Sequence, residues 1–151
     1  MNETTSPPQP APAVVSLRDA AAALPAVQSG ARWFWWIAGL SLVNIVMFQS
    51  GSNTSFVMGL GITAVSDAVF VGNKPVGFAI DAIAIGLFVL VGYLGRRASL
   101  AAFYLGVTVY TFDALIFVYI KDWMPVAFHG LAIYFIVRGI LALQAALKVT
   151  A

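Results

Sequence analysis

Long apolar stretches separated by short polar breaks dominate the chain from residue 33 onward. Each stretch is close to the roughly 20 residues that a helix needs to cross the hydrocarbon core of a bilayer. The breaks hold glycine, proline, asparagine or paired charges, which are typical of turns. The pattern therefore predicts four membrane-spanning helices, at Trp33–Gln49, Val76–Gly95, Ala98–Ile120 and Val126–Leu147.

A fifth apolar stretch, Phe56–Val71, is shorter and would make only about 24 Å of helix. If it does not cross, five basic residues fall on one side of the membrane and two on the other; if it crosses, the split is three against four. The five are Arg18, Arg32, Arg96, Arg97 and Lys148, and the two are Lys74 and Lys121. Because basic residues concentrate on the cytoplasmic side, we predict four spans, one re-entrant or interfacial helix and cytoplasmic termini. Five spans remain the alternative.

Residues 1–31 differ from the rest and form a predicted N-terminal tail on the cytoplasmic side, ahead of a transmembrane domain at 32–151. Prolines crowd Met1–Ala13, which predicts disorder. Ser16 is placed to cap a short helix that runs through Leu24 and stops at Pro25. The acidic Glu3 near the start is not typical of a signal peptide.

Composition agrees with a membrane location. The chain has 151 residues, of which 61% are hydrophobic and only 9% charged, whereas soluble domains carry about 25% charged residues. So few charges cannot cover a water-facing surface, so lipid must cover much of this one. The predicted fold class is an all-α, polytopic transmembrane helical bundle. Its predicted partner is the lipid bilayer in which it is embedded.

The amino-acid composition argues against several functional classes. The chain has no cysteine, which excludes disulfides, thiolate zinc sites and a cysteine nucleophile. It has one histidine, and its single glutamate is Glu3, which argues against a zinc, di-iron or bis-histidine haem centre. No dense basic stripe supports nucleic-acid binding. We expect no cofactor.

The later part of the chain contains the run Gly95-Arg96-Arg97, the pair Asp122-Trp123 and the pair Phe128-His129. In these residues the chain resembles small multi-span inner-membrane proteins of bacteria. The resemblance implies location in the inner membrane and brings no chemistry with it.

Ionisable residues inside predicted spans are costly and are therefore candidates for function. We select a polar intramembrane cluster that consists of Asn44, Asp67, Asp81, Asp113 and His129, with Arg138 as a separate charge. A rise of about 1.5 Å per residue places the cluster in the outward half of the bilayer. Such a cluster can hold a proton, a cation or a divalent metal, or it can fix helix packing. Asp113 and Arg138 are one possible pair.

Two functions fit these observations. The first is a non-catalytic accessory or scaffold subunit of a membrane assembly, which needs no motif beyond the spans. The alternative is an oligomeric transporter or channel module that uses the outward Asp/His cluster for protons or cations. A faint internal repeat, in which Gly30–Arg32 and Gly95–Arg97 each precede a span, supports the alternative. An enzyme is the least favoured class.

Overall fold

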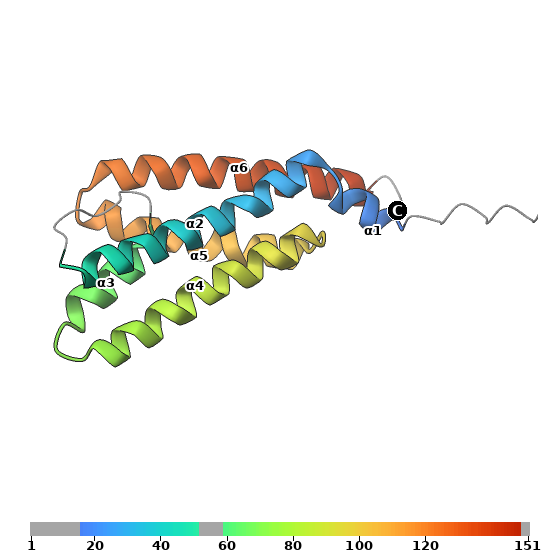
Figure 1. The fold of residues 1–151 in the computed structure, drawn as a ribbon. Coiled ribbons are helices and arrows are strands. Elements are labelled where there is room, and N and C mark those ends of the chain that lie inside the picture. The colour runs from blue at the N-terminus through green and yellow to red at the C-terminus, as the bar shows by residue number, and fades with distance from the viewer. Residues whose placement is uncertain (1–15, 52–58, 149–151) are drawn as a thin grey trace, which may run out of the picture.

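The computed structural model describes residues 16–51 and 59–148, and in these two ranges every regular element is a helix (Figure 1). The elements are α1 (Leu17–Ala22), α2 (Pro25–Gln49), α3 (Gly61–Val69), α4 (Lys74–Arg96), α5 (Leu100–Tyr119) and α6 (Trp123–Lys148).

Four of the described helices, α2, α4, α5 and α6, are long and apolar enough to cross a membrane. Helix α3 has nine residues, or about 14 Å, which is less than half of a hydrocarbon core about 30 Å thick. The prediction of four spans plus one short helix is therefore confirmed, and α3 gives the five-span alternative no support. Residues 52–58, where the predicted short stretch begins, lie outside the described range.

The entry to the first span differs from the prediction. Helix α2 begins at Pro25, about two turns before the expected start at Trp33. Proline suits the first turn of a helix because its missing N–H would have no partner there, so Pro25 both ends α1 and starts α2. Ser16 caps α1 as predicted, accepting from the Asp19 N–H at 3.1 Å. The predicted disordered segment Met1–Ala13 lies outside the described residues.

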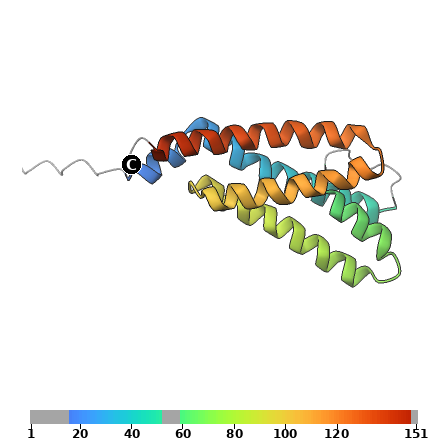
Figure 2. The ribbon, with the colours of Figure 1, turned by 180° about the vertical axis from the view of Figure 1, so that it is seen from behind.

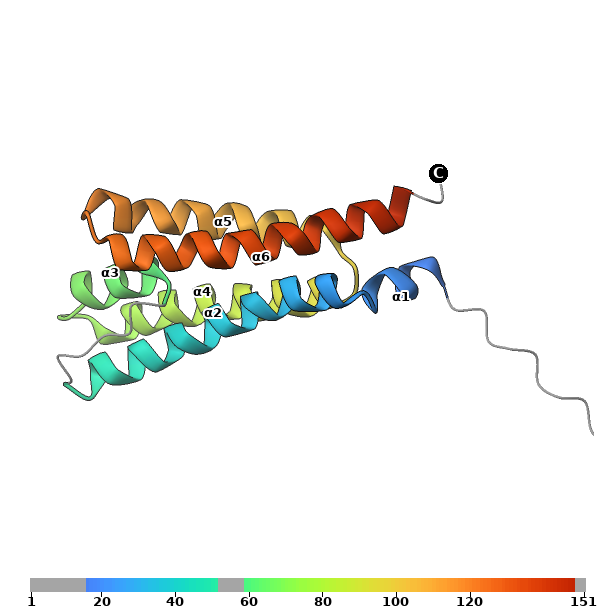
Figure 3. The same cartoon turned by 90° about the horizontal axis from the view of Figure 1, so that it is seen from above.

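The long helices pack as a bundle around an aromatic core. Helix α2 lies against both α4 and α6, while α5 packs on α6 and α4; Figure 3 shows α5 beside α6 and α2 beside α4. Phe34, Phe88, Phe103 and Tyr110 are fully buried at the centre. Their rings meet in tilted or edge-on pairs 5.8–6.1 Å apart, a favourable aromatic geometry.

The bundle has two distinct ends (Figures 1 and 2). One, which we call the basic end, carries α1, the turn between α4 and α5 and the end of α6, and therefore the positions of Arg18, Arg96, Arg97 and Lys148. The other, which we call the α3 end, carries α3 and the turns that hold Lys74 and Lys121. Four of the chain's eight basic residues thus lie at the basic end and two at the α3 end.

Candidate functional site

The first turn of α3 is held by side chains from two other helices. The N–H of Leu60 donates to Ser41 Oγ of α2 at 2.8 Å. The N–H groups of Gly61 and Ile62 donate to Asp113 Oδ2 and Oδ1 of α5 at 2.7 and 2.9 Å. The first N–H groups of any helix have no partner inside it, so α2 and α5 satisfy those of α3 from outside.

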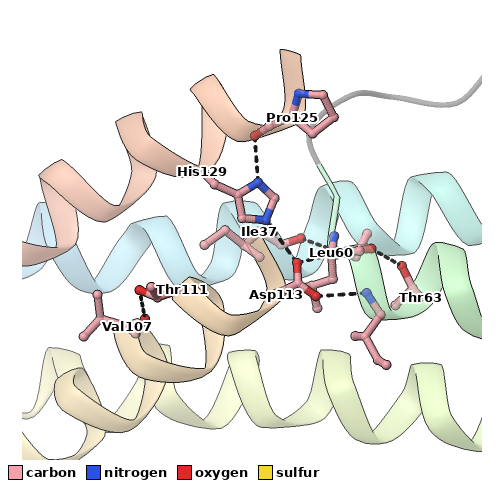
Figure 4. Close-up of polar contacts among 11 residues, drawn as sticks. Ile37, Leu60, Thr63, Val107, Thr111, Asp113, Pro125 and His129 are labelled. Carbon is pink, nitrogen blue, oxygen red and sulfur yellow. Dashed lines mark hydrogen bonds and ion pairs between the residues drawn. The ribbon is translucent and has the colours of Figure 1, made fainter. Parts of the chain in front are cut away.

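His129 joins the same site from α6 (Figure 4). Its Nδ1 lies 2.8 Å from the Pro125 carbonyl oxygen, and its Nε2 lies 3.0 Å from Asp113 Oδ2. Because a carbonyl oxygen only accepts, Nδ1 must carry a hydrogen. Nε2, the other nitrogen of the ring, is therefore the atom that meets the Asp113 carboxylate.

Ring stacking holds the imidazole of His129 in place, in addition to its hydrogen bonds. It stacks on the Tyr110 ring with centroids 4.2 Å apart and planes 16° from parallel. The side chains of His129 and Asp113 are 1% and 3% exposed, so water does not compete for their hydrogen bonds. Helices α2, α5 and α6 therefore converge on the first turn of α3 through Ser41, Asp113 and His129; we call these three residues the α3 cap.

The sequence offered Arg138 as a partner for Asp113, and that pairing is wrong. Among the described residues, the ion pair of Asp113 is with His129. Arg138 lies nine positions further along α6, about 14 Å from His129 along the helix axis. Its guanidinium instead lies over the Tyr134 ring, 5.9 Å from the centroid.

Asp67 and Asp81 form a second polar group, between α3 and α4. Asp67 Oδ1 accepts from Gln49 Nε2 at 3.3 Å. Asp81 is 2% exposed, and neither of its carboxylate oxygens has a hydrogen-bond partner within the described ranges. Ser66 lies against this carboxylate, but its hydroxyl donates to the Gly77 carbonyl at 3.1 Å. Asp67 is close enough for its charge to act on Asp81.

A cavity of about 220 Å³ adjoins this second group. Gln49, Ser66, Asp67, Lys74 and Gly77 contribute its polar and backbone lining. Asn44 lies on the other side of Asp67, where both line a separate cavity of about 260 Å³. The Asp67 carboxylate therefore has space beside it for a small ion with water, whereas Asp81 lines neither cavity.

The structure thus gathers the five candidate residues near the α3 end and divides them. Asp113 and His129 serve the α3 cap, whereas Asp67 on α3 and Asp81 on α4 belong to the second polar group. In the ranges 16–51 and 59–148, no three histidine or acidic side chains come together as a metal site would require. Ser41 was not singled out from the sequence, because a lone serine that also bonds its own helix, at the Ile37 carbonyl, leaves no pattern.

Comparisons of the chain with protein-family models, with curated proteins and with solved structures give no match. The four apolar spans alone indicate a multi-pass membrane protein.

Proposed function

We propose that the protein is a non-catalytic accessory or scaffold subunit of a larger membrane assembly. The observation that supports this is the α3 cap. The buried polar atoms of Ser41, Asp113 and His129 are directed at backbone N–H groups and at one another. Polar residues used in this way hold α3 in a fixed position and so stabilise one structure of the bundle, which is the role of a scaffold.

Partner subunits would bind the outer faces of the bundle. Each span exposes large aliphatic side chains, for example Leu42 (52%), Ile83 (73%), Leu115 (53%) and Leu141 (58%). In a membrane these side chains contact lipid, another subunit or a second copy of the chain. Our proposal places the assembly in a bacterial inner membrane with both termini in the cytoplasm, on the strength of the basic-residue count.

Bulky substitutions on these faces test the proposal. Fluid lipid accommodates a larger side chain, whereas a packed helix interface does not. Leu42→Trp, Ile83→Trp, Leu115→Trp and Leu141→Trp place one tryptophan on each span. We expect all four variants to melt like the wild type, and one or two to lose a partner that co-migrates at fixed stoichiometry in native gels of solubilised membranes. A wild-type chain that migrates as a monomer, unchanged in every variant, would refute the proposal.

Asp81 supports a second candidate function, proton- or cation-linked transport by an oligomer. A buried carboxylate without a hydrogen-bond partner in the described residues needs a proton or a cation to offset its charge. The charge of Asp67 acts on Asp81, and the 220 Å³ cavity offers room for an ion beside the Asp67 carboxylate. This differs from the sequence-based hypothesis, because Asp113 and His129 are occupied by the α3 cap.

Proteoliposomes that contain a pH-sensitive dye separate the two candidates. Transport predicts a flux in the wild type that Asp81→Asn abolishes while the melting temperature stays the same. Thr111→Val, on the outer side of α5, is the control and should keep the flux. The scaffold proposal predicts no flux above empty liposomes.

A further inference from the structure

An open hollow of about 600 Å³ lies at the basic end, between α1, the end of α4 and the start of α5. Three arginines line it, Arg18 from α1 and Arg96 and Arg97 from the turn after α4. Asp19 is the one acidic residue in the lining. Leu94 and Ala22 supply apolar surface beside these charges.

Within residues 16–51 and 59–148, none of the three arginines forms an ion pair with a carboxylate. Asp19 accepts from the Ser16 hydroxyl and caps α1 with it. The ion pair formed by the described residues, His129–Asp113, lies at the α3 end. The hollow therefore carries three positive charges against the one negative charge of Asp19, which favours an anionic ligand.

Two of the guanidinium groups are held in place. Arg96 Nε donates to Gln28 Oε1 at 2.8 Å, and its guanidinium lies 4.9 Å from the centroid of the Trp35 ring. Arg97 lies 4.3 Å from the centroid of Tyr93. Because a guanidinium carries five N–H donors, the remaining donors of Arg96 are available to a ligand. Stacking on rings reduces the side-chain freedom that binding would cost.

Gln28 sets the position of the surrounding backbone. Its Nε2 donates to the Ala22 carbonyl at 2.6 Å and to the Arg96 carbonyl at 3.2 Å. The end of α1 and the end of α4 are therefore tied to the same side chain of α2. This connection keeps Arg18 on α1 within reach of the hollow that Arg96 and Arg97 line.

We propose that this hollow binds the phosphate headgroup of an anionic phospholipid. The hollow opens at the end of a membrane span, beside the aromatic rings of Trp35 and Tyr93, which are typical of the interface between lipid tails and water. Arginines at such a depth meet headgroup phosphates, and basic pockets between spans favour anionic lipids. Exposed Leu90 and Leu94 on α4 offer a path for an acyl chain. The inference holds whether the protein is a scaffold or a transporter.

The test uses the full chain in a non-ionic detergent, titrated with phosphatidylglycerol, phosphatidylcholine or inorganic phosphate. Retained lipid is measured by native mass spectrometry and stabilisation by thermal melting. We expect phosphatidylglycerol to be retained and to raise the melting temperature, with little effect of the other two. Each arginine near a headgroup contributes roughly fivefold in affinity. Arg96→Gln combined with Arg97→Gln should therefore weaken binding by about 30-fold.

Arg32→Gln is the matched control, because it removes one exposed charge from the same half of the bundle without touching the hollow. Its affinity should stay within about twofold of the wild type on the same scale. If the double variant does not fold, Arg18→Gln alone should weaken binding about fivefold. Equal binding of phosphatidylcholine, an equal loss in Arg32→Gln, unchanged binding in the arginine variants, or saturation by inorganic phosphate would each overturn the proposal.

Discussion

Asp113 caps the first turn of α3, although a helix is usually capped by the residue just before it. Most helices are capped by serine, threonine, aspartate or asparagine at the residue just before the first turn. The residue at that position in α3 is Leu60, which has no side chain able to accept. Asp113 accepts both N–H bonds from α5 instead. A helix of nine residues is marginal alone, so its position depends on this distant carboxylate.

Substitutions at Asp113 should therefore follow a defined order. In Asp113→Asn one oxygen becomes an NH₂ group, which can face His129 but cannot accept from Gly61, so one buried N–H loses its partner. We expect a loss of about 1–3 kcal/mol in the free energy of unfolding. Asp113→Leu leaves both N–H groups and His129 without that partner and should cost clearly more. Unfolding in mixed micelles measures both.

Thr111→Val is the control for this series. Its hydroxyl is exposed and bonds only within α5, to the Val107 carbonyl at 2.7 Å (Figure 4). Its stability should stay within about 0.5 kcal/mol of the wild type. If Asp113→Leu is as stable as Thr111→Val, the α3 cap does not hold the short helix.

His129 and Asp113 should be energetically coupled. His129→Phe keeps a ring to stack on Tyr110 but removes both hydrogen bonds of the imidazole. Combined with Asp113→Asn, it completes a double-mutant cycle on the unfolding free energy. We expect the two losses to be non-additive by about 0.5–3 kcal/mol, as for residues that share one hydrogen-bond network. Additive losses would show that the 3.0 Å contact contributes nothing.

At the scale of elements, α2 and α6 approach closely where Gly30 faces Gly139. A Cβ atom on Gly139 would lie 3.1 Å from both the Ala26 carbonyl oxygen and Gly30 Cα. These are backbone atoms, which cannot rotate away as a side chain can. The contact is one of the small-residue approaches common between membrane helices.

Gly139→Ala should therefore push α2 and α6 apart, at a cost of about 1–3 kcal/mol. Gly130 offers a comparison on the same helix, because a Cβ there meets nothing within 4 Å. Gly130→Ala should leave stability unchanged or raise it slightly, since alanine favours helix over glycine. Thermal melting of the two variants side by side gives the answer. Equal melting temperatures would mean that the approach of the helices is looser than the structure shows.

The elements were largely predictable, and the exceptions have physical causes. Hydropathy and length locate spans well because lipid imposes both. Pro25 was interpreted only as the end of α1, although proline also starts helices. The fifth stretch is apolar like the spans, but it is shorter than they are, and its helix α3 has only nine residues. The residues that hold α3 are Ser41 on α2 and Asp113 on α5. Both are distant from α3 in the sequence, so no local pattern predicts them.

At the scale of the whole molecule, the depths of the polar residues were predictable but their pairings were not. Depth follows from the rise per residue, and it placed Asp81, Asp113 and His129 in the half of the bundle where the structure has them. Pairing depends on how each helix is rotated and which helices are neighbours. Asp113 therefore pairs with His129 rather than with Arg138.

The bundle also makes a prediction about orientation. Four spans return the chain to the side from which it started, so the ends of the described chain, Ser16 and Lys148, share a side. The basic end should be cytoplasmic, because short loops rich in lysine and arginine resist translocation. An alkaline phosphatase that is active only in the periplasm should be inactive when fused after Lys148 and active when fused at Asn73, in the turn before α4.

A fluorescent protein that folds only in the cytoplasm should give the opposite pattern at the same two sites. Three spans, α4, α5 and α6, separate Asn73 from Lys148, so the two sites should report opposite sides of the membrane. Phosphatase activity after Lys148 but not at Asn73 would mean that the bundle is inverted or that the segment before α4 crosses the membrane. Phosphatase activity at both sites or at neither would mean that one of these three spans does not cross. Only activity at Asn73 alone agrees with α3 as a short helix that the Asp113 carboxylate holds on the outward side.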